Sequence, residues 1–395
     1  MNILVVCQHY YPENFQITDI CEGLVKRGHN VTALVGLPNY PSGYVPKEYK
    51  HNRRHYEQIN GVNIVRCNEI GRRHNPFYLM LNYLSFYISS MHYIRKIKGD
   101  FDCVFSYQLS PVTMGLSARY YAKKHNIPLY LYCCDLWPES AKMYIKNENN
   151  PIFFVAKKIS SRVYNSCNKI SVQSKTFIDY FKSVHGIEEN KMIYIPAFAD
   201  DKYLQKDYIL DNGIIDFVFL GNIGIAQNLD LIIEAVKKIK HLNFRLHIVG
   251  DGTTLNSIKQ LVAKNNLTDK VIFYGRRPVE EMEEFYKLAD ACIVSLNADN
   301  KTGLTLPAKV QGYMAAGKPI IGMINGAAQD VIRESKCGVC VNAGDVVGLS
   351  EIMKDFIINP DKYKDCGNNG RQYFKENFKK DKVIEMIEAT IKELI

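Results

Sequence analysis

A lysine near the start of a predicted helix is the first residue that could carry chemistry. Lys309 lies in residues 302–319, which are predicted to form a loop, a helix opened near Pro307 and a glycine stop at Gly317. A cation in the first turn of a helix opposes the helix dipole unless an anion lies beside it. We therefore favour Lys309 as a phosphate ligand, with an ordinary solvated lysine as the alternative.

Two glycine-containing turns are candidates for the same phosphate. Residues 219–228 are predicted to form a strand, a turn with two glycines and the start of a helix. Residues 249–253 follow the next predicted strand and also contain two glycines. Glycine lets the backbone approach a ligand closely, and the amides at a helix start attract phosphate. One such turn is common, but two in register predict a diphosphate site.

Two carboxylates in another loop suit a different ligand. Asp135 and Glu139 follow the predicted strand 129–133 and flank Trp137, the only tryptophan of the chain. Carboxylates accept hydrogen bonds from sugar hydroxyls, and aromatic rings stack on sugar faces, whereas helix capping is the ordinary alternative. The loop 10–14 follows the first predicted strand. Open parallel sheets bind ligands at the carboxyl ends of their strands, so we expect all these loops to share one cleft.

Short β-branched runs alternate with helix-length segments along the whole chain, as is typical of parallel sheets with crossover helices. The predicted strands are residues 3–7, 31–35, 62–67, 103–107, 129–133, 170–173 and 192–195, and then 215–220, 244–249, 271–274, 292–296, 319–323 and 338–341. A length of 395 residues favours two domains. We predict two doubly wound α/β domains, 1–198 and 199–378, with the boundary in the polar stretch 196–214.

The net charge and the cysteines indicate which ligands and which cellular compartment suit this protein. The net charge of +9, from 50 Lys and Arg against 41 Asp and Glu, suits anionic ligands or an anionic membrane surface. The 11 cysteines lie mostly in apolar runs, which indicates reduced, buried thiols of a cytosolic protein. Cys337 and Cys340 form a CxxC without a second pair, so we expect a structural role. Met1 enters a strand-like run without a basic leader, and we expect no secretory signal.

Residues 77–94 form a long apolar run. About 17 to 25 residues are needed to span a membrane, but a polar residue recurs in this run at every third or fourth position. These polar residues are Asn82, Ser85, Ser89 and His92, and the basic residues that flank the run are Arg72, Arg73, Arg95 and Lys96. The pattern favours a helix that lies at a membrane interface, with a buried crossover helix as the alternative.

Five motifs are spread over nearly the whole chain. They are residues 11–15 (YPENF), 36–43 (GLPNYPSG), 135–140 (DLWPES), 221–224 (GNIG), and the run from PAK to GKP at 307–319. Together they resemble family 4 glycosyltransferases, in particular the bacterial O-antigen and capsule branch that includes N-acetylfucosamine transferases. The resemblance implies the GT-B fold, in which two Rossmann-like domains face a central cleft. It also implies that the segment 379–395, with its helix near 382–395, crosses back to pack on the first domain.

The chain departs from the wider family at several positions. That family usually carries two Glu separated by seven residues, and Leu304 and Gly312 stand at those places. Asn222 replaces a customary Arg, and Cys134 replaces a frequent His. Diphosphate binding would then depend on Lys309, on the first glycine turn and on backbone amides around 304–306.

Residue types and resemblance together give three sets of candidate site residues. The catalytic candidates are Lys309, which would stabilise the leaving diphosphate, and Asp135 and Glu139, which would orient the acceptor hydroxyl or the donor sugar. The donor-binding candidates are Gly221, Asn222, Gly224, Gly250, Asp251, Arg276, Gly303, Leu304, Thr305, Leu306 and Lys309. The acceptor-binding candidates are Glu13, Asn14, Asn39, Tyr40, Asp135, Trp137 and Glu139. No metal ligand set is expected.

The function implied by the resemblance is retaining transfer of a sugar, with an N-acetylated amino sugar as a candidate, from UDP to a polyprenyl-diphosphate-linked saccharide. The expected setting is surface polysaccharide assembly (capsule, O-antigen or lipopolysaccharide), in the cytoplasm and peripheral on the inner face of the cell membrane. We expect a UDP-sugar as co-substrate, no cofactor and no nucleic-acid partner. Two alternatives stay open: a sugar-nucleotide epimerase of the same fold, and a non-catalytic partner subunit, which the two missing Glu make conceivable.

Overall fold

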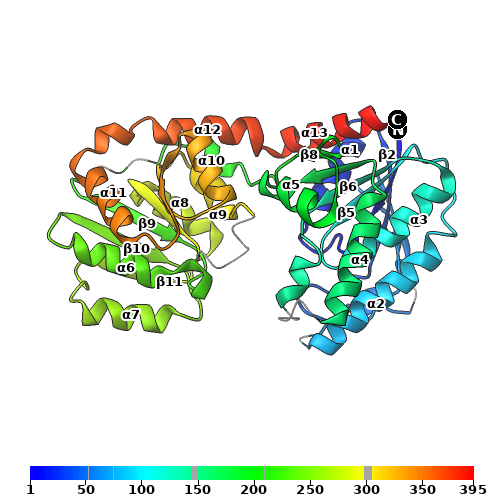
Figure 1. Ribbon diagram of the computed structural model, residues 1–395, viewed down its shortest axis with the longest axis horizontal. Coiled ribbons are helices and arrows are strands. Elements are labelled where there is room, and N and C mark those ends of the chain that lie inside the picture. The colour runs from blue at the N-terminus through cyan, green and yellow to red at the C-terminus, as the bar shows by residue number, and fades with distance from the viewer. Residues whose placement is uncertain (52, 74, 144–149, 209, 211, 298–304) are drawn as a thin grey trace. The chain divides into compact units, whose positions relative to one another are not determined.

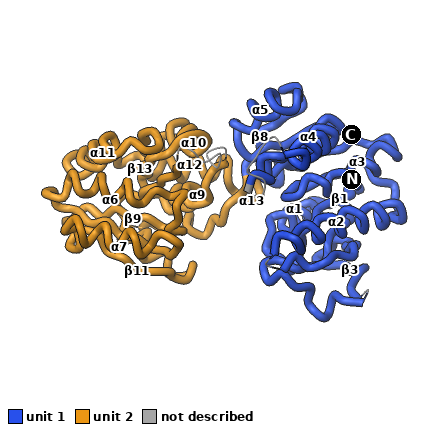
Figure 2. Tube along the Cα trace, turned by 60° about the horizontal axis from the view of Figure 1, so that its bottom comes forward, with its two compact units in different colours: residues 1–196, 383–395 blue, residues 197–382 orange. Residues whose placement is uncertain are grey.

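The computed structural model describes residues 1–51, 53–73, 75–143, 150–208, 210, 212–297 and 305–395 (Figure 1). The chain divides into two compact units (Figure 2). The first unit is Met1–Pro196 together with Val383–Ile395, and the second is Ala197–Lys382. The divisions therefore lie at 196/197 and 382/383, whereas the sequence suggested 198/199 and 378/379.

The first unit contains an eight-stranded sheet in the order β3-β4-β2-β1-β5-β6-β7-β8. All neighbouring strands are parallel except β3 and β4, which are antiparallel. The strands are β1 (Asn2–Val6), β2 (Asn30–Val35), β3 (Tyr56–Ile59), β4 (Val62–Arg66), β5 (Cys103–Gln108), β6 (Leu129–Cys133), β7 (Lys169–Val172) and β8 (Met192–Tyr194). The sequence did not predict β3, because this edge strand is short and none of its residues is buried.

The helices of the first unit include one from the far end of the sequence. They are α1 (Gln16–Lys26), α2 (Pro76–Tyr93), α3 (Gly115–His125), α4 (Pro151–Asn165), α5 (Thr176–Tyr180) and α13 (Lys380–Leu394). Glu388 of α13 lies 2.8 Å from His29 through its Oε1 atom and the ring Nε2. A Cβ atom added at Gly23 of α1 would lie only 2.5 Å from Ile384 Cδ1. Close helix packing and a buried hydrogen bond therefore hold α13 in the first unit.

The second unit contains a six-stranded sheet in the order β11-β10-β9-β12-β13-β14, and all neighbouring strands are parallel. The strands are β9 (Ile215–Leu220), β10 (Phe244–Val249), β11 (Val271–Gly275), β12 (Ala291–Ser295), β13 (Ile320–Met323) and β14 (Gly338–Val341). The helices are α6 (Leu229–Lys238), α7 (Leu255–Lys264), α8 (Met282–Leu288), α9 (Ala308–Ala315), α10 (Ala327–Ser335), α11 (Val346–Ile358) and α12 (Cys366–Asn377).

Alternate residues of β9 enter two separate cores. Phe217 and Phe219 join one hydrophobic cluster, whereas Val218 and Leu220 join a second cluster. Because successive strand residues point to opposite faces, both faces of the second sheet are buried under helices. This burial explains why the strands appear in the sequence as continuous apolar runs.

Each sheet has one point where the strand order reverses. From β1 the chain builds outward through β2 and β4, and it returns to place β5 on the other side of β1. In the second sheet the same reversal separates β9 from β12. Ligands of open parallel sheets bind beside such a switch point, at the carboxyl ends of the strands. The loops after β1, β5, β9 and β12 are therefore the first places to seek a site.

The structure shows which side of α2 is buried. Asn82, from the predicted polar stripe, is fully buried and its Nδ2 donates to the Ile70 carbonyl oxygen at 2.7 Å. Four large apolar side chains of α2 are exposed: Phe77, Met80, Leu84 and Ile88. Within the ranges described above, no helix combines the length and the apolar character needed to cross a membrane.

Candidate active site

Lys309 lies in the first turn of α9, beside the end of β9. Its Nζ atom is buried, lies 3.9 Å from the centre of the Phe219 ring and has no hydrogen-bond partner in the described part of the chain. Burial lowers the pKa of Lys309 to about 8. A buried ammonium group without a counter-charge is unfavourable, so the surroundings of Nζ are suited to an anionic ligand.

The two predicted glycine turns meet next to this ammonium group. Gly221 has φ +127°, and a Cβ atom there would lie 3.3 Å from Lys309 Nζ. Gly250 has φ +145°, and a Cβ atom there would lie 1.8 Å from the Gly221 carbonyl oxygen. Both positions require glycine for conformation, and Gly250 requires it for space as well. The structure therefore brings Lys309 and the two glycine turns together at one edge of the sheet.

Gln227 organises the first turn, and the sequence did not single it out. Its Oε1 atom accepts hydrogen bonds from Asn222 Nδ2 and from the Gly224 amide, each at 3.1 Å. Its carbonyl oxygen accepts a hydrogen bond from the Ser295 hydroxyl at the end of β12. Gln227 thus ties the loop after β9 to the strand across the switch point. Asn222 and Gly224 consequently shape the turn, while Gly221 faces Lys309.

The other donor-binding candidates are spread around the same sheet edge. Asp251 follows β10, is exposed, and accepts the Gly252 amide through Oδ1 at 2.7 Å. Arg276 follows β11 and is exposed. Thr305 is exposed and Leu306 is half-buried, whereas Gly303 and Leu304 lie outside the described residues.

Gly312, where the wider family carries Glu, has little room for a side chain. A Cβ atom at this position of α9 would lie 2.9 Å from the hydroxyl oxygen of Tyr286. Tyr286 belongs to the core cluster on that side of the sheet. The neighbouring tyrosine therefore fits a glycine here, and a larger residue would require Tyr286 to move.

Asp135 is held by Ser110, from the loop that follows the neighbouring strand β5, and Ser110 is held in turn by Trp137. The Ser110 hydroxyl donates to Asp135 Oδ2 at 2.8 Å, and the indole Nε1 of Trp137 donates to Ser110 Oγ at 3.0 Å. Burial raises the pKa of Asp135, and the hydrogen bonds from Ser110 oppose that rise. Ser110 follows β5 directly, beside the switch point, and this position is the signal that could have identified it.

Glu139 is not a second free carboxylate beside Asp135. Its Oε2 atom lies 2.6 Å from Lys142 Nζ, within the same short helical segment (Glu139–Met143). The Tyr180 hydroxyl lies 3.5 Å from its other oxygen. An ion pair therefore offsets the charge of Glu139, and we expect it to contribute less than Asp135.

The loop after β1 is organised by a buried carboxylate. Glu13 Oε2 lies 2.7 Å from His9 Nδ1, and Glu13 Oε1 accepts the backbone amides of Asn39 and Tyr40, both at 2.6 Å. Glu13 and Asn39 are buried, whereas Asn14 and Tyr40 are exposed. Glu13 and Asn39 thus position the loop, and Tyr40 and Asn14 remain as candidates for direct contact with a ligand.

Glu69 completes this buried network, although no motif of the sequence points to it. Its Oε1 atom accepts hydrogen bonds from Gln8 and Asn39, each at 2.9 Å, and from Asn82 of α2. Burial raises the pKa of Glu69 to about 7. Glu69 therefore links the ends of β1 and β2 to helix α2.

Two family models match successive parts of the chain. Residues 15–203 match the model described as "Glycosyltransferase Family 4", and residues 201–373 match the one described as "Glycosyl transferases group 1". The chain belongs to the glycosyltransferases. The predicted enzyme class and the predicted GT-B fold are confirmed, because both family models and the two parallel sheets agree with them.

Curated relatives of this glycosyltransferase are distant. It is 24% identical to N-acetyl-alpha-D-glucosaminyl L-malate synthase of Bacillus anthracis, in a match that spans 48% of each chain, about half the length of that relative. It is 23% identical to an uncharacterized glycosyltransferase of Methanocaldococcus jannaschii, over 92% of this chain and 87% of the relative. The structure of Anabaena HepE in complex with UDP has a TM-score of 0.70 at 14% identity and covers 100% of both chains. At that identity the likeness shows the fold.

Proposed function

We propose that this glycosyltransferase moves a sugar from UDP to a hydroxyl group of a polyprenyl-diphosphate-linked saccharide, with retention of the anomeric configuration. The observation that carries the proposal is Lys309, a buried ammonium group without a partner in the described residues, next to two glycine turns at a sheet switch point. A diphosphate supplies the missing negative charge. The UDP bound to the similar HepE structure supports a uridine diphosphate as the donor nucleotide.

Lys309 would act on the leaving group. Negative charge grows on the diphosphate as its bond to the sugar breaks, and a cation already in place stabilises that charge without reorganisation. The interaction is strengthened because Nζ is shielded from water. A bound diphosphate favours the charged form of the amine, so it would raise the pKa of Lys309 back above 8 and keep the group protonated during turnover.

Asp135 would act on the acceptor. Ser110 and Trp137 fix the orientation of its carboxylate through two successive hydrogen bonds. The residue is half-buried, so part of it stays accessible to an incoming sugar hydroxyl. A carboxylate at this place would accept the hydroxyl proton or orient the hydroxyl for attack. Trp137 and Tyr40 would offer ring faces to the saccharide.

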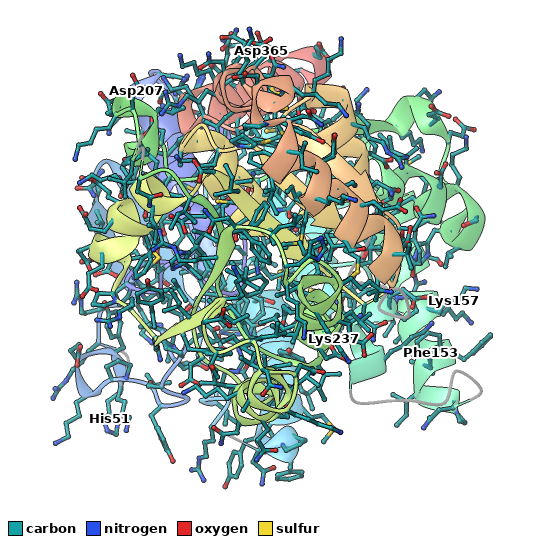
Figure 3. The ribbon with its side chains drawn as sticks, turned by 90° about the vertical axis from the view of Figure 1, so that its left-hand side faces the viewer. His51, Phe153, Lys157, Asp207, Lys237 and Asp365 are labelled. Atoms are coloured by element: carbon teal, nitrogen blue, oxygen red, sulfur yellow. The ribbon has the colours of Figure 1, made fainter. Side chains whose placement is uncertain are left out.

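We further propose that the first unit works against the inner face of the cell membrane, where a polyprenyl-linked acceptor resides. The exposed apolar side of α2 supports this proposal, as does the first turn of α4, where Ile152, Phe154 and Val155 are exposed. Lys157 of α4 extends outward from the ribbon nearby (Figure 3). Crossover helices begin at the carboxyl edge of a parallel sheet, so both apolar segments begin at the edge that carries the acceptor candidates.

The test is product analysis with a panel of UDP-sugars, N-acetylated amino sugars included, and a polyprenyl diphosphate saccharide, with the Lys309→Ala variant as control. A new glycoside that depends on Lys309 supports the proposal, and its anomeric configuration tests retention. Formation of an epimerised sugar without use of the acceptor would identify an epimerase. Nucleotide binding without any product from the whole panel would identify a partner subunit.

A further inference from the structure

We infer that Arg72 and Arg73 form a binding site for the phosphate groups of a lipid-linked phosphate at the start of α2. The inference rests on the proposed lipid-linked acceptor and locates the part of the protein that would hold its charged group. It separates these two arginines from the other basic residues that flank the same helix.

Two hydrogen bonds hold in place the loop that carries Arg72 and Arg73. The Arg73 amide donates to the Gly43 carbonyl oxygen at 2.9 Å, and the Arg72 amide donates to Asn39 Oδ1 at 3.2 Å. Arg73 has φ +45°, a left-handed backbone conformation that residues other than glycine rarely adopt. Such conformations persist where the surrounding structure fixes them, and they concentrate at ligand-binding sites. The loop is therefore a fixed platform for two cations.

Both guanidinium groups lie over tyrosine rings. Arg73 Cζ lies 3.8 Å from the ring centre of Tyr78, and Arg72 Cζ lies 5.2 Å from that of Tyr40. Neither guanidinium forms a hydrogen bond or ion pair within the described part of the chain. Stacking leaves the N–H groups at the edge of each guanidinium available, and their fork geometry matches phosphate oxygens. Two such groups on adjacent residues suit a diphosphate.

The surface next to the arginines is apolar. Phe77, Met80, Leu84 and Ile88 recur at three- and four-residue steps along α2 and are each at least half exposed. Helical residues at these steps lie on one side, so they form a continuous apolar stripe. Arginines at one end of an apolar stripe are complementary to an anionic head on a hydrocarbon chain. A prenyl phosphate has this composition, and a free phosphate would use only the arginines.

The opposite end of α2 provides a matched comparison. Arg95 follows the helix, is exposed, and also lies over a tyrosine ring, 5.1 Å from the centre of Tyr120. The helix has 18 residues, so its ends are about 27 Å apart. Arg95 therefore lies towards the amino edge of the sheet, away from the acceptor candidates, whereas Arg72 contacts the Tyr40 ring. Arg95→Gln is therefore the control variant, because it also removes one positive charge that lies over a tyrosine ring beside α2.

The experiment measures binding of the full chain to three probes without any UDP-sugar. The probes are phosphatidylcholine vesicles containing a polyprenyl diphosphate, phosphatidylcholine vesicles made equally anionic with phosphatidylglycerol, and inorganic pyrophosphate in solution. We expect tighter binding to the polyprenyl diphosphate vesicles than to the phosphatidylglycerol vesicles. Arg72→Gln and Arg73→Gln should each weaken binding to the polyprenyl diphosphate vesicles about 10-fold, as loss of a charge-assisted hydrogen bond does. Arg95→Gln should weaken it less than about 3-fold, as loss of an exposed charge does.

Three outcomes would overturn the inference. They are equal affinity for the two kinds of vesicle, a loss of vesicle affinity in Arg95→Gln as large as that in Arg72→Gln and Arg73→Gln, and binding of pyrophosphate as tight as that of the polyprenyl diphosphate vesicles. Thermal unfolding of each variant shows whether it is folded. Because no donor is present, a failure here leaves the assignment of Lys309 intact. Conversely, absence of glycoside formation with normal vesicle selectivity would reject the proposed function and keep the lipid site.

Discussion

The carboxyl edges of the two sheets satisfy their charged groups in opposite ways. At the edge of the first sheet, Glu13, Glu69 and Asp135 are each bound by hydrogen-bond donors from other loops or strands. At the edge of the second sheet, Lys309 Nζ has no such partner among the described residues, and the turns beside it are built from glycine. The hydrogen bonds of the first edge form without any ligand, whereas the charge at the second edge would be balanced by the anion that we propose binds there.

This difference indicates that the carboxylates of the first edge hold loops in position, whereas Lys309 of the second edge is suited to bind a ligand. A buried charge that already has partners is expensive to disturb, because removing one partner leaves the other buried and unpaired. A buried charge without partners destabilises the empty protein and is stabilised by its ligand. Mutations at the two edges should therefore have different consequences.

The largest effect is expected at Asp135. Asp135→Asn keeps the shape but removes the charge that would accept the acceptor proton, so transfer should fall about 1000-fold or more. UDP affinity should stay within a few fold, because the second unit would hold the nucleotide. Glu139→Gln should reduce transfer less, since Lys142 already offsets that carboxylate.

Steady-state kinetics and calorimetry with UDP measure the two quantities separately. A loss of UDP affinity in Asp135→Asn as large as that in Lys309→Ala would remove the distinction between the two edges.

The next effect is expected at Lys309. Lys309→Ala should lower turnover on the order of 100-fold or more, as loss of one preorganised charge contact does. In the absence of ligand, Lys309→Met should be at least as stable as the unmutated protein, because it removes a buried charge that has no counter-charge within the described part of the chain. Thermal unfolding with and without UDP tests both parts. Near-normal turnover in Lys309→Ala would exclude the residue from the site.

Ser110→Ala should have the smallest effect and should change the pH profile. The Ser110 hydroxyl lowers the pKa of Asp135 against the effect of burial, so its removal should raise that pKa further. As the pH is lowered, Asp135 would then become protonated at a higher pH than in the unmutated protein. The acid limb of the pH–rate profile should therefore shift to higher pH, and turnover at neutral pH should fall about 10-fold. A lower rate with an unchanged acid limb would mean that Ser110 acts only on structure.

Local sequence rules predicted most of the fold and one part of the site. Buried parallel strands are continuous apolar runs, so the predicted β6 and β9 agree with the structure to the residue. Lys309 and Gly221 were found because helix starts and glycine turns are local signals. The exposed edge strand β3 lacks the apolar run and was missed.

The remainder depends on contacts between distant residues. Asn82 was predicted to lie on a polar stripe of its helix, but periodicity alone does not say which side of a helix is buried. Its inward position is possible since Glu69 and Gln8 satisfy its amide, and these partners are 13 and 74 residues away in sequence. Ser110 binds Asp135 across 25 residues for the same reason. Such pairings follow from strand order, which local patterns do not specify.

The most direct test of the central claim is the pH dependence of UDP binding, measured by calorimetry between about pH 7 and 9, where a terminal phosphate is already ionised. The folded-state pKa of Lys309 is lowered from 10.5 to about 8, so this amine is charged below that pH and loses its proton above it. We expect the UDP affinity of the unmutated protein to decline as pH rises through about 8, whereas Lys309→Met should bind UDP weakly and without that decline. An equal affinity of both proteins, unchanged across the range, would contradict this expectation.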